Sequence, residues 1–238
     1  PLYPQHPHVD DPAPQFGEVE VTGRFAGKMI MLNPLHTSPA DRILYQRAVQ
    51  AHGEASDDRF RMWWIEGGDY TPSPSDSTRY VDYSGVLQVA MGDLIAWVED
   101  GTPPPASTVY TYDEFSKFTL PSAASERLGV QPVVRITANG ASRAEVAAGE
   151  DVVFEVEAHT PPDTGTIVAA RCDFDGSASW PHVEDVEPAE HLAFTVTHRY
   201  DRAGTYFPAV DLTAHRHGDA DDSTGHIHNL GRARVVVS

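Results

Sequence analysis

The stretch DVVFEVEA, residues 151–158, decides the fold of the second half of this chain. Val152, Phe154, Val156 and Ala158 are apolar, and the residues between them are mostly acidic. Because successive side chains of a β-strand point to opposite faces, this alternation predicts a strand with one buried and one hydrated face. Strands of this kind are typical of antiparallel sheets.

Similar short runs flank this stretch and are separated by Gly, Pro and Asp. They are VVRITA (133–138), TIVAARCDF (166–174), HLAFTVTHRY (191–200), TYFPAVDLTAH (205–215) and ARVVV (233–237). Six or seven strands of this length predict an antiparallel β-sandwich over residues 132–238.

The first half of the chain has a different pattern. GKMIMLN (27–33) and RFRMWWIE (59–66) predict two strands, the first buried on both faces, and one of Trp63 and Trp64 is expected to face the core. Helices are expected over 37–53 and over roughly 80–100, the second with an apolar stripe at Leu87, Met91, Leu94 and Val98. This strand–helix–strand–helix order predicts a parallel α/β sheet. Two strands do not make a stable sheet of that kind alone, so we expect part of a larger domain.

The expected organisation is an α/β portion with an extended N-terminal lead-in at 1–105, a linker at 106–131 and the β-sandwich at 132–238. The net charge of −18 is spread over both halves, which disfavours nucleic acid and anionic membranes as partners. No apolar run approaches the roughly 20 residues that cross a bilayer. Cys172 is the only cysteine, which excludes an intrachain disulfide and a cysteine-based zinc site.

Two segments of the second half carry a resemblance. CDFDG (172–176) and HRYDRAGTY (198–206), with the spacing between them, resemble a PKD-like domain. Cys172 stands where that family usually has Trp, and the Gly-Asp-Gly turn is shortened. The resemblance implies an immunoglobulin-like sandwich, in which Phe174 and Tyr206 would anchor the core. It also implies a secreted or cell-surface location.

The first half is similar to the C-terminal part of an α/β-hydrolase of the tannase and feruloyl esterase group. The segments that carry this are GKMIMLNPLHTSP (27–39), RFRMWWIEGGDYTP (59–72) and AWVEDGTPPP (96–105). The resemblance puts His36 at the position of the triad acid and Tyr70 at that of the triad histidine. The nucleophile motif Gly-x-Ser-x-Gly is absent from the sequence. Tyrosine is a poor base at neutral pH, and a histidine does not orient a base as a buried carboxylate does. We therefore expect a degenerate site without catalytic residues, and leave open whether the chain belongs to an enzyme.

Histidines gather in HRHGDADDSTGHIH (215–228). On strands, His215 with His217 and His226 with His228 would share a face, and a hairpin could bring all four to one metal ion. The alternative is a polar loop with solvated imidazoles, which we favour because no fixed ligand spacing is met. No other cofactor is expected. The aspartates of DFDG (173–176) and GDADD (218–222) are expected to bond the backbone of their own turns rather than calcium.

Two functions remain open. The first is a secreted or surface-associated, non-catalytic binding or structural protein that engages a protein partner or a glycan. A protein partner would cover the incomplete sheet, and would be a missing N-terminal half, a second copy or a larger assembly. The alternative is a C-terminal fragment of a secreted serine esterase whose nucleophile lies on a missing upstream segment.

Overall fold

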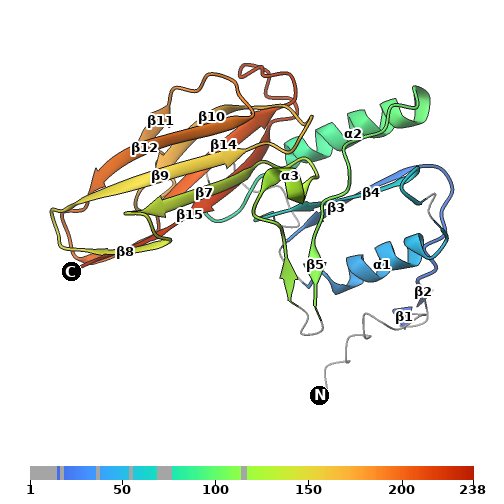
Figure 1. The fold of residues 1–238 in the computed structure, drawn as a ribbon, viewed down its shortest axis with the longest axis horizontal. Helices are drawn as coiled ribbons and strands as arrows, with labels where there is room; N and C mark the ends of the chain where they lie inside the picture. The colour runs from blue at the N-terminus through green and yellow to red at the C-terminus, as the bar shows by residue number, and fades with distance from the viewer. Residues whose placement is uncertain (1–14, 17–18, 36–37, 54–55, 69–76, 114–116) are drawn as a thin grey trace.

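The computed structural model describes residues 15–16, 19–35, 38–53, 56–68, 77–113 and 117–238. It consists of an α/β unit followed by a β-sandwich, which lie side by side (Figure 1). A short pair of strands, β1 (Gln15–Phe16) and β2 (Val19–Glu20), precedes both. None of the helices among the described residues is long and apolar enough to cross a membrane.

The α/β unit comprises β3 (Met29–Pro34), α1 (Ala40–Gln50), β4 (Phe60–Ile65) and α2 (Ser84–Glu99). The two strands are parallel and in register from Met29 opposite Phe60 to Pro34 opposite Ile65. The two helices cover opposite faces of this small sheet (Figure 1). The predicted strand–helix–strand–helix order and the parallel pairing are therefore confirmed.

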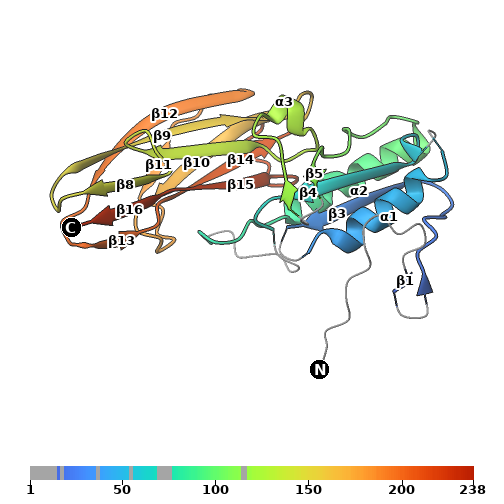
Figure 2. The ribbon, with the colours of Figure 1, turned by 60° about the horizontal axis from the view of Figure 1, so that its bottom comes forward.

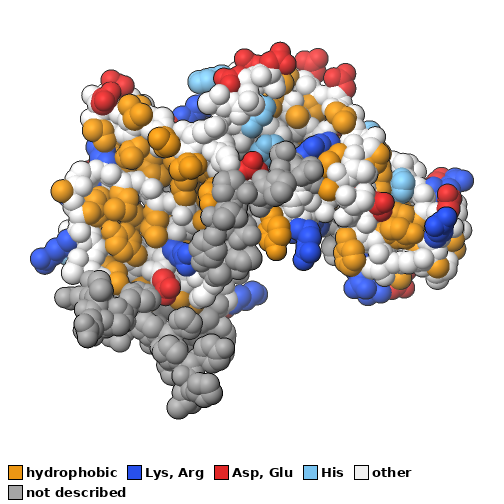
Figure 3. Space-filling model, turned by 180° about the vertical axis from the view of Figure 1, so that it is seen from behind, with side chains coloured by type: hydrophobic (Ala, Val, Ile, Leu, Met, Phe, Trp, Pro, Cys, Tyr) orange, Lys and Arg blue, Asp and Glu red, His pale blue; other side chains and the backbone are white. Residues whose placement is uncertain are grey.

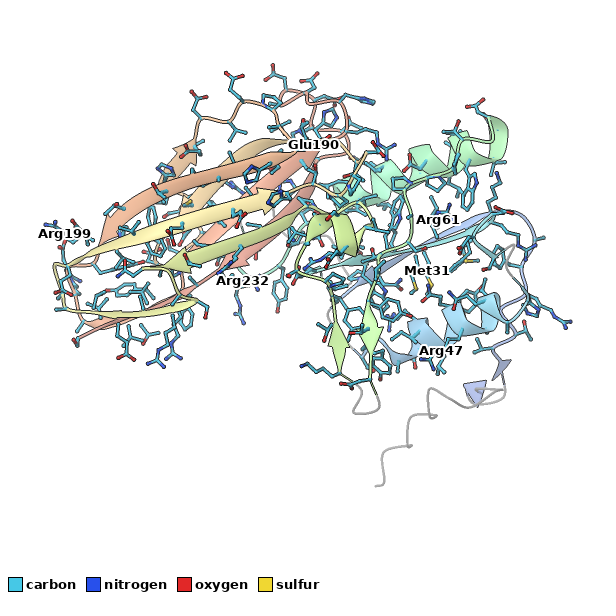
Figure 4. All side chains as sticks on the ribbon, in the orientation of Figure 1. Met31, Arg47, Arg61, Glu190, Arg199 and Arg232 are labelled. Atoms are coloured by element: carbon cyan, nitrogen blue, oxygen red, sulfur yellow. The ribbon has the colours of Figure 1, made fainter. Side chains whose placement is uncertain are left out.

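Strand β4 is buried on both faces. Met62 and Trp64 pack on the α1 side with Ile43 and Val49, whereas Trp63 and Ile65 pack on the α2 side. Figure 4 shows Met31 of the neighbouring strand β3 pointing into the same α1 layer. The expectation that one of the two tryptophans faces the core is corrected, because Trp63 and Trp64 are 0% and 3% exposed on opposite faces.

The segment after α2 runs back along β4. The backbone N–H of Thr108 donates to the Met62 carbonyl at 2.9 Å, and the Trp64 N–H donates to Thr108 Oγ1 at 3.1 Å. Two short strands, β5 (Thr111–Tyr112) and β6 (Phe118–Thr119), and the helical turn α3 (Ala124–Arg127) follow. Phe118 packs its ring 4.7 Å from that of Trp64. The segment predicted as a linker thus covers the outer edge of β4.

The β-sandwich contains ten strands. They are β7 (Val133–Ala138), β8 (Arg143–Val146), β9 (Asp151–His159), β10 (Thr166–Asp173), β11 (His182–Glu184), β12 (His191–Arg199), β13 (Gly204–Tyr206), β14 (Ala209–His215), β15 (Ile227–Arg232) and β16 (Arg234–Val237). They form sheets in the orders β11-β10-β14-β15, β12-β9-β7 and β13-β16-β8. All pairs are antiparallel except β16 with β8. The sequence predicted six or seven strands. The number is larger because β8 and β11 have little signal in the sequence, and because the run 205–215 divides into two strands at Pro208.

The core of the sandwich lies between its layers (Figure 2). The alternating residues of β9 all enter it, with Val152, Phe154 and Ala158 at 0% exposure. Phe174 lies 5.7 Å from Phe154 between ring centroids, and Tyr200 Oη donates to the Phe174 carbonyl at 2.7 Å. The alternation seen in the sequence therefore identifies the buried face correctly.

The two parts share an interface. Val86 and Ala90 of α2 pack in one cluster with Val130 and with Ile227 of β15. Helix α2 approaches so closely that a Cβ atom on Gly85 would lie 1.8 Å from the His226 carbonyl oxygen. Side chains also bridge the parts, since Gln131 Nε2 donates to the carbonyls of Glu66, at 3.1 Å, and of His228, at 3.0 Å.

Candidate functional site

Helix α2 carries an exposed apolar stripe. Leu87, Met91, Ile95 and Val98 follow one another at helical spacing and are 46%, 59%, 56% and 61% exposed. We call these four residues the α2 stripe. Seen from behind, hydrophobic side chains also gather over the half of the molecule that holds the α/β unit (Figure 3). A continuous exposed apolar face of this kind is a feature of surfaces that bind another molecule.

The opposite face of α2 fixes the helix in place. Trp97 is buried, with the Lys28 ammonium 4.9 Å and the Arg61 guanidinium 5.1 Å from its ring (Figure 4). Asp93 holds Arg216 of the sandwich through both carboxylate oxygens, the Nη2–Oδ2 bond being 2.8 Å. This bond raises the pKa of Arg216. The α2 stripe is therefore presented on a helix that both parts of the molecule anchor.

Strand β3 adds an open edge to this surface. Among the described residues β3 pairs with β4 alone, and the sheet ends at β3. The residues of β3 are half-buried apart from Asn33, which is 1% exposed. An edge strand leaves every second N–H and C=O free to pair with another strand. The α/β unit therefore offers backbone hydrogen-bonding groups as well as an apolar helix face.

The two positions of the degenerate triad, His36 and Tyr70, lie outside the described residues. Residues close to them in the sequence lie at the ends of β3 and β4. Among the described residues the amide Nδ2 of the buried Asn33 has no hydrogen-bond partner, and Gly68 forms a parallel bridge with Val81. The degenerate hydrolase site remains a prediction.

The four histidines of the segment 215–228 become neighbours, with ring centroids of successive pairs 5.6–6.4 Å apart. Two of them are engaged by protein groups. His215 Nδ1 accepts a hydrogen bond from the Asp219 N–H at 2.9 Å, and His228 Nδ1 lies 3.2 Å from Asp211 Oδ1. Burial lowers the pKa of His226, so this imidazole stays neutral at pH 7. No three of these histidines have ligand atoms within 4.8 Å of one another in the described structure, and a metal site here remains a prediction.

The turn aspartates behave as expected from the sequence. Asp173 accepts hydrogen bonds from the backbone N–H groups of Asp175, Gly176 and Ser179 at 2.5–3.0 Å. Asp219 accepts from those of Asp221 and Asp222 at 2.9 and 3.2 Å. Local backbone bonding is thereby confirmed for both turns.

Two features escaped the sequence reasoning. Ile95 belongs to the exposed stripe, and periodicity alone did not separate it from Leu94, which is half-buried. The second feature is a group formed by Glu157, His159 and His191, whose ligand atoms all lie within 4.8 Å of one another. Glu157 and His159 are two residues apart on β9, which is a signal in the sequence, but His191 joins them only through the register of β12.

No family model matches this chain, and no curated protein does. A CARDB domain from Pyrococcus furiosus, crystallised in complex with di-metal ions, is 14% identical over 45% of this chain and 92% of its own, with a TM-score of 0.32. The PKD domain of an M14-like peptidase from a Thermoplasmatales archaeon is 12% identical over 46% and 98%, with a TM-score of 0.33. An engineered protein is 13% identical over 89% of this chain and 48% of its own, with a TM-score of 0.28.

Likenesses at this level assign neither a family nor a function. The β-sandwich itself is established by the strands of this chain. The hydrolase resemblance gains no support from these structures.

Proposed function

We propose that this chain is a non-catalytic interaction protein that docks a protein partner through the α2 stripe and the open edge of β3. The exposed stripe carries the proposal. Four large apolar side chains in line on a fixed helix are unfavourable in water, and covering them removes apolar surface at about 25 cal/mol per Å². The sandwich then serves as the support that holds α2 in place.

The partner inferred from this surface is a polypeptide rather than a glycan. A strand added beside β3 would pair with its free backbone groups, and an apolar face would cover the α2 stripe. The added strand would extend the parallel sheet, whose two faces α1 and α2 already cover. A missing half of a hydrolase-like domain, supplied by a separate chain or by upstream sequence, would provide both the strand beside β3 and the apolar face over the α2 stripe. We further propose a secreted or cell-surface location, tested by fractionation of the source cells.

The experiment is native mass spectrometry of the protein purified from its source, with and without substitution of the stripe. The variant Met91→Glu with Ile95→Glu places two charges on the surface that the partner would cover. We expect a stoichiometric second chain or a species heavier than 26.0 kDa for the wild type, and at least a tenfold smaller complexed fraction for the variant.

The matched control is Val183→Glu. Val183 is 72% exposed on β11 of the sandwich and lies outside the stripe, so this variant should leave the complex intact. A wild-type protein that stays a 26.0 kDa monomer would contradict the proposal, as would equal loss of the complex in both variants. A complex that labels with a serine-reactive probe would instead show an assembled hydrolase and refute the non-catalytic part.

A further inference from the structure

A cluster of three metal-ligating side chains lies on the outer face of the sandwich, on strands β9 and β12. Strands β9 and β12 are antiparallel, and His159 stands directly opposite His191. Glu157 lies two residues before His159 and therefore shares its face of the sheet. All three residues are exposed. We infer that Glu157, His159 and His191 form a binding site for a divalent transition-metal ion such as Zn²⁺.

The register of the two strands brings the histidines together. The Thr160 N–H donates to the Glu190 carbonyl at 2.9 Å, so the adjoining pair His159 and His191 is a non-hydrogen-bonded pair. Side chains approach more closely at such pairs than at hydrogen-bonded ones. The two imidazole rings accordingly lie parallel within 17°, with centroids 4.3 Å apart. His159 Nε2 is also 3.4 Å from Glu157 Oε1.

The three ligand atoms need to move only slightly to bind one ion. The ligand atoms of the three residues all lie within 4.8 Å of one another. Zn–N and Zn–O bonds of about 2.0–2.2 Å in a tetrahedral site place ligand atoms roughly 3.4 Å apart. Rotation of exposed side chains about χ1 and χ2 closes this difference while the strands stay in place.

The surroundings of the cluster form a cleft. It has a volume of about 520 Å³ and is lined by Glu157, His159 and His191 together with Glu190 and Arg135. Figure 4 shows Glu190 just before β12. Arg135 stands in register with Glu157 on β7 and offsets part of its charge, whereas Glu190 adds a second carboxylate to the cleft. The cleft therefore has space for an ion with water or a small anion at its open coordination position.

The donor set selects the kind of ion. Two imidazole nitrogens and one carboxylate oxygen suit Zn²⁺, Cu²⁺ and Ni²⁺, whereas Ca²⁺ and Mg²⁺ require oxygen ligands throughout. Three protein ligands leave a fourth position open.

The test is isothermal titration calorimetry of the full chain, freed of metal by a chelator that is then removed, with ZnCl₂ as the probe. Because all three side chains are exposed, their substitution leaves the fold intact, which circular dichroism verifies. We expect one Zn²⁺ site whose affinity falls at least tenfold in His159→Ala and in His191→Ala, and several-fold in Glu157→Gln. MgCl₂ and CaCl₂ should give no binding at this site.

His217→Ala is the matched control. His217 is also exposed on the sandwich, but it belongs to the other histidine group. The control should bind Zn²⁺ as the wild type does. Unchanged affinity in His159→Ala and His191→Ala would overturn the proposal, as would an absence of Zn²⁺ binding by the wild type or the same loss in the His217→Ala control.

Discussion

The two parts of the molecule complete their cores in different ways. The core of the sandwich is built by its own strands and closing loops, from Ile136 on β7 to Val237 on β16. The α2 side of the α/β unit instead includes Val130 from the following segment and Ile227 from β15, while the α2 stripe stays exposed. A β-sandwich buries one face of each sheet against the other, whereas a two-stranded parallel sheet needs neighbours on both edges and both faces. We therefore expect the stability of the α/β unit to depend on the sandwich, and the sandwich to fold without the α/β unit.

The largest expected effect comes from emptying the core of the sandwich. Phe154 is 0% exposed, and Phe154→Ala should lower the free energy of unfolding by about 4 kcal/mol. Urea unfolding is followed by circular dichroism for the β-strands and by tryptophan fluorescence. The fluorescence reports mainly on the α/β unit, because Trp63, Trp64 and Trp97 lie there and only Trp180 lies in the sandwich. Since the α/β unit relies on the sandwich, both signals should shift to lower urea together.

A substitution in the core of the α/β unit should have a more local effect. Ile43 of α1 is also 0% exposed, and Ile43→Ala should shift the fluorescence transition while the circular dichroism transition of the strands stays in place. If Phe154→Ala moved the circular dichroism signal alone, the dependence of the α/β unit on the sandwich would be disproved.

A smaller effect is expected at the interface between the parts. The added methyl group in Gly85→Ala would lie 1.8 Å from the His226 carbonyl oxygen, so the helix must move and the variant should lose about 2 kcal/mol. The control, Gly92→Ala, lies on the same helix where a Cβ meets nothing within 4 Å, and should gain up to about 1 kcal/mol from helix propensity. Thermal unfolding measures both. Equal changes in the two variants would show that α2 does not rest on the sandwich at Gly85.

An effect of similar size depends on pH. Burial raises the pKa of the Cys172 thiol to about 12, and Cys172 is 1% exposed in the sandwich core. As pH rises, the thiol of the unfolded chain, with a pKa of about 8.5, ionises before the thiol of the folded chain. Below that pH both are protonated, and the folded protein keeps its full stability. Stability should then fall as pH rises toward 12, by at most about 1.4 kcal/mol per unit. A Cys172→Ala variant, compared by urea unfolding between pH 8 and 10, should lack this fall.

The same property is visible in the reactivity of the thiol. A thiol reagent should label Cys172 only after denaturation, because the thiol is both buried and protonated in the folded protein. Rapid labelling of the native protein would show that the core of the sandwich opens readily.

Sequence reasoning succeeded where a pattern in one segment determines the structure. The alternation in 151–158 identifies the buried face of β9, and the continuous apolar runs identify β3 and β4 as parallel strands. It was incomplete for α2, where the large side chains Leu87 and Met91 point to solvent. The buried face begins with Gly85, Val86 and Ala90, whose small size allows this end of the helix to approach the sandwich closely, and continues with Asp93 and Trp97.

The candidate metal sites show the same limit. His-x-His spacing directed attention to the segment 215–228, where contacts with Asp211, Asp219 and the α2 interface occupy the region. His159 and His191 are 32 positions apart and meet only through the pairing of β9 with β12. Register between distant strands is set by the packing of the whole sheet, so a single segment does not reveal it.

Helix α2 and strand β8 both contact strands that are synthesised much later, so these contacts form late during synthesis. The α/β unit is synthesised before the sandwich, and Ile227 of β15, which packs against α2, emerges from the ribosome long after α2. Strand β8 likewise cannot pair until β16 has been synthesised, and most of the sandwich is translated between these two strands. Pairings so distant along the chain close slowly. Until β15 has been translated, the part of α2 that later contacts Ile227 stays uncovered, and the nascent chain exposes this apolar surface in addition to the α2 stripe.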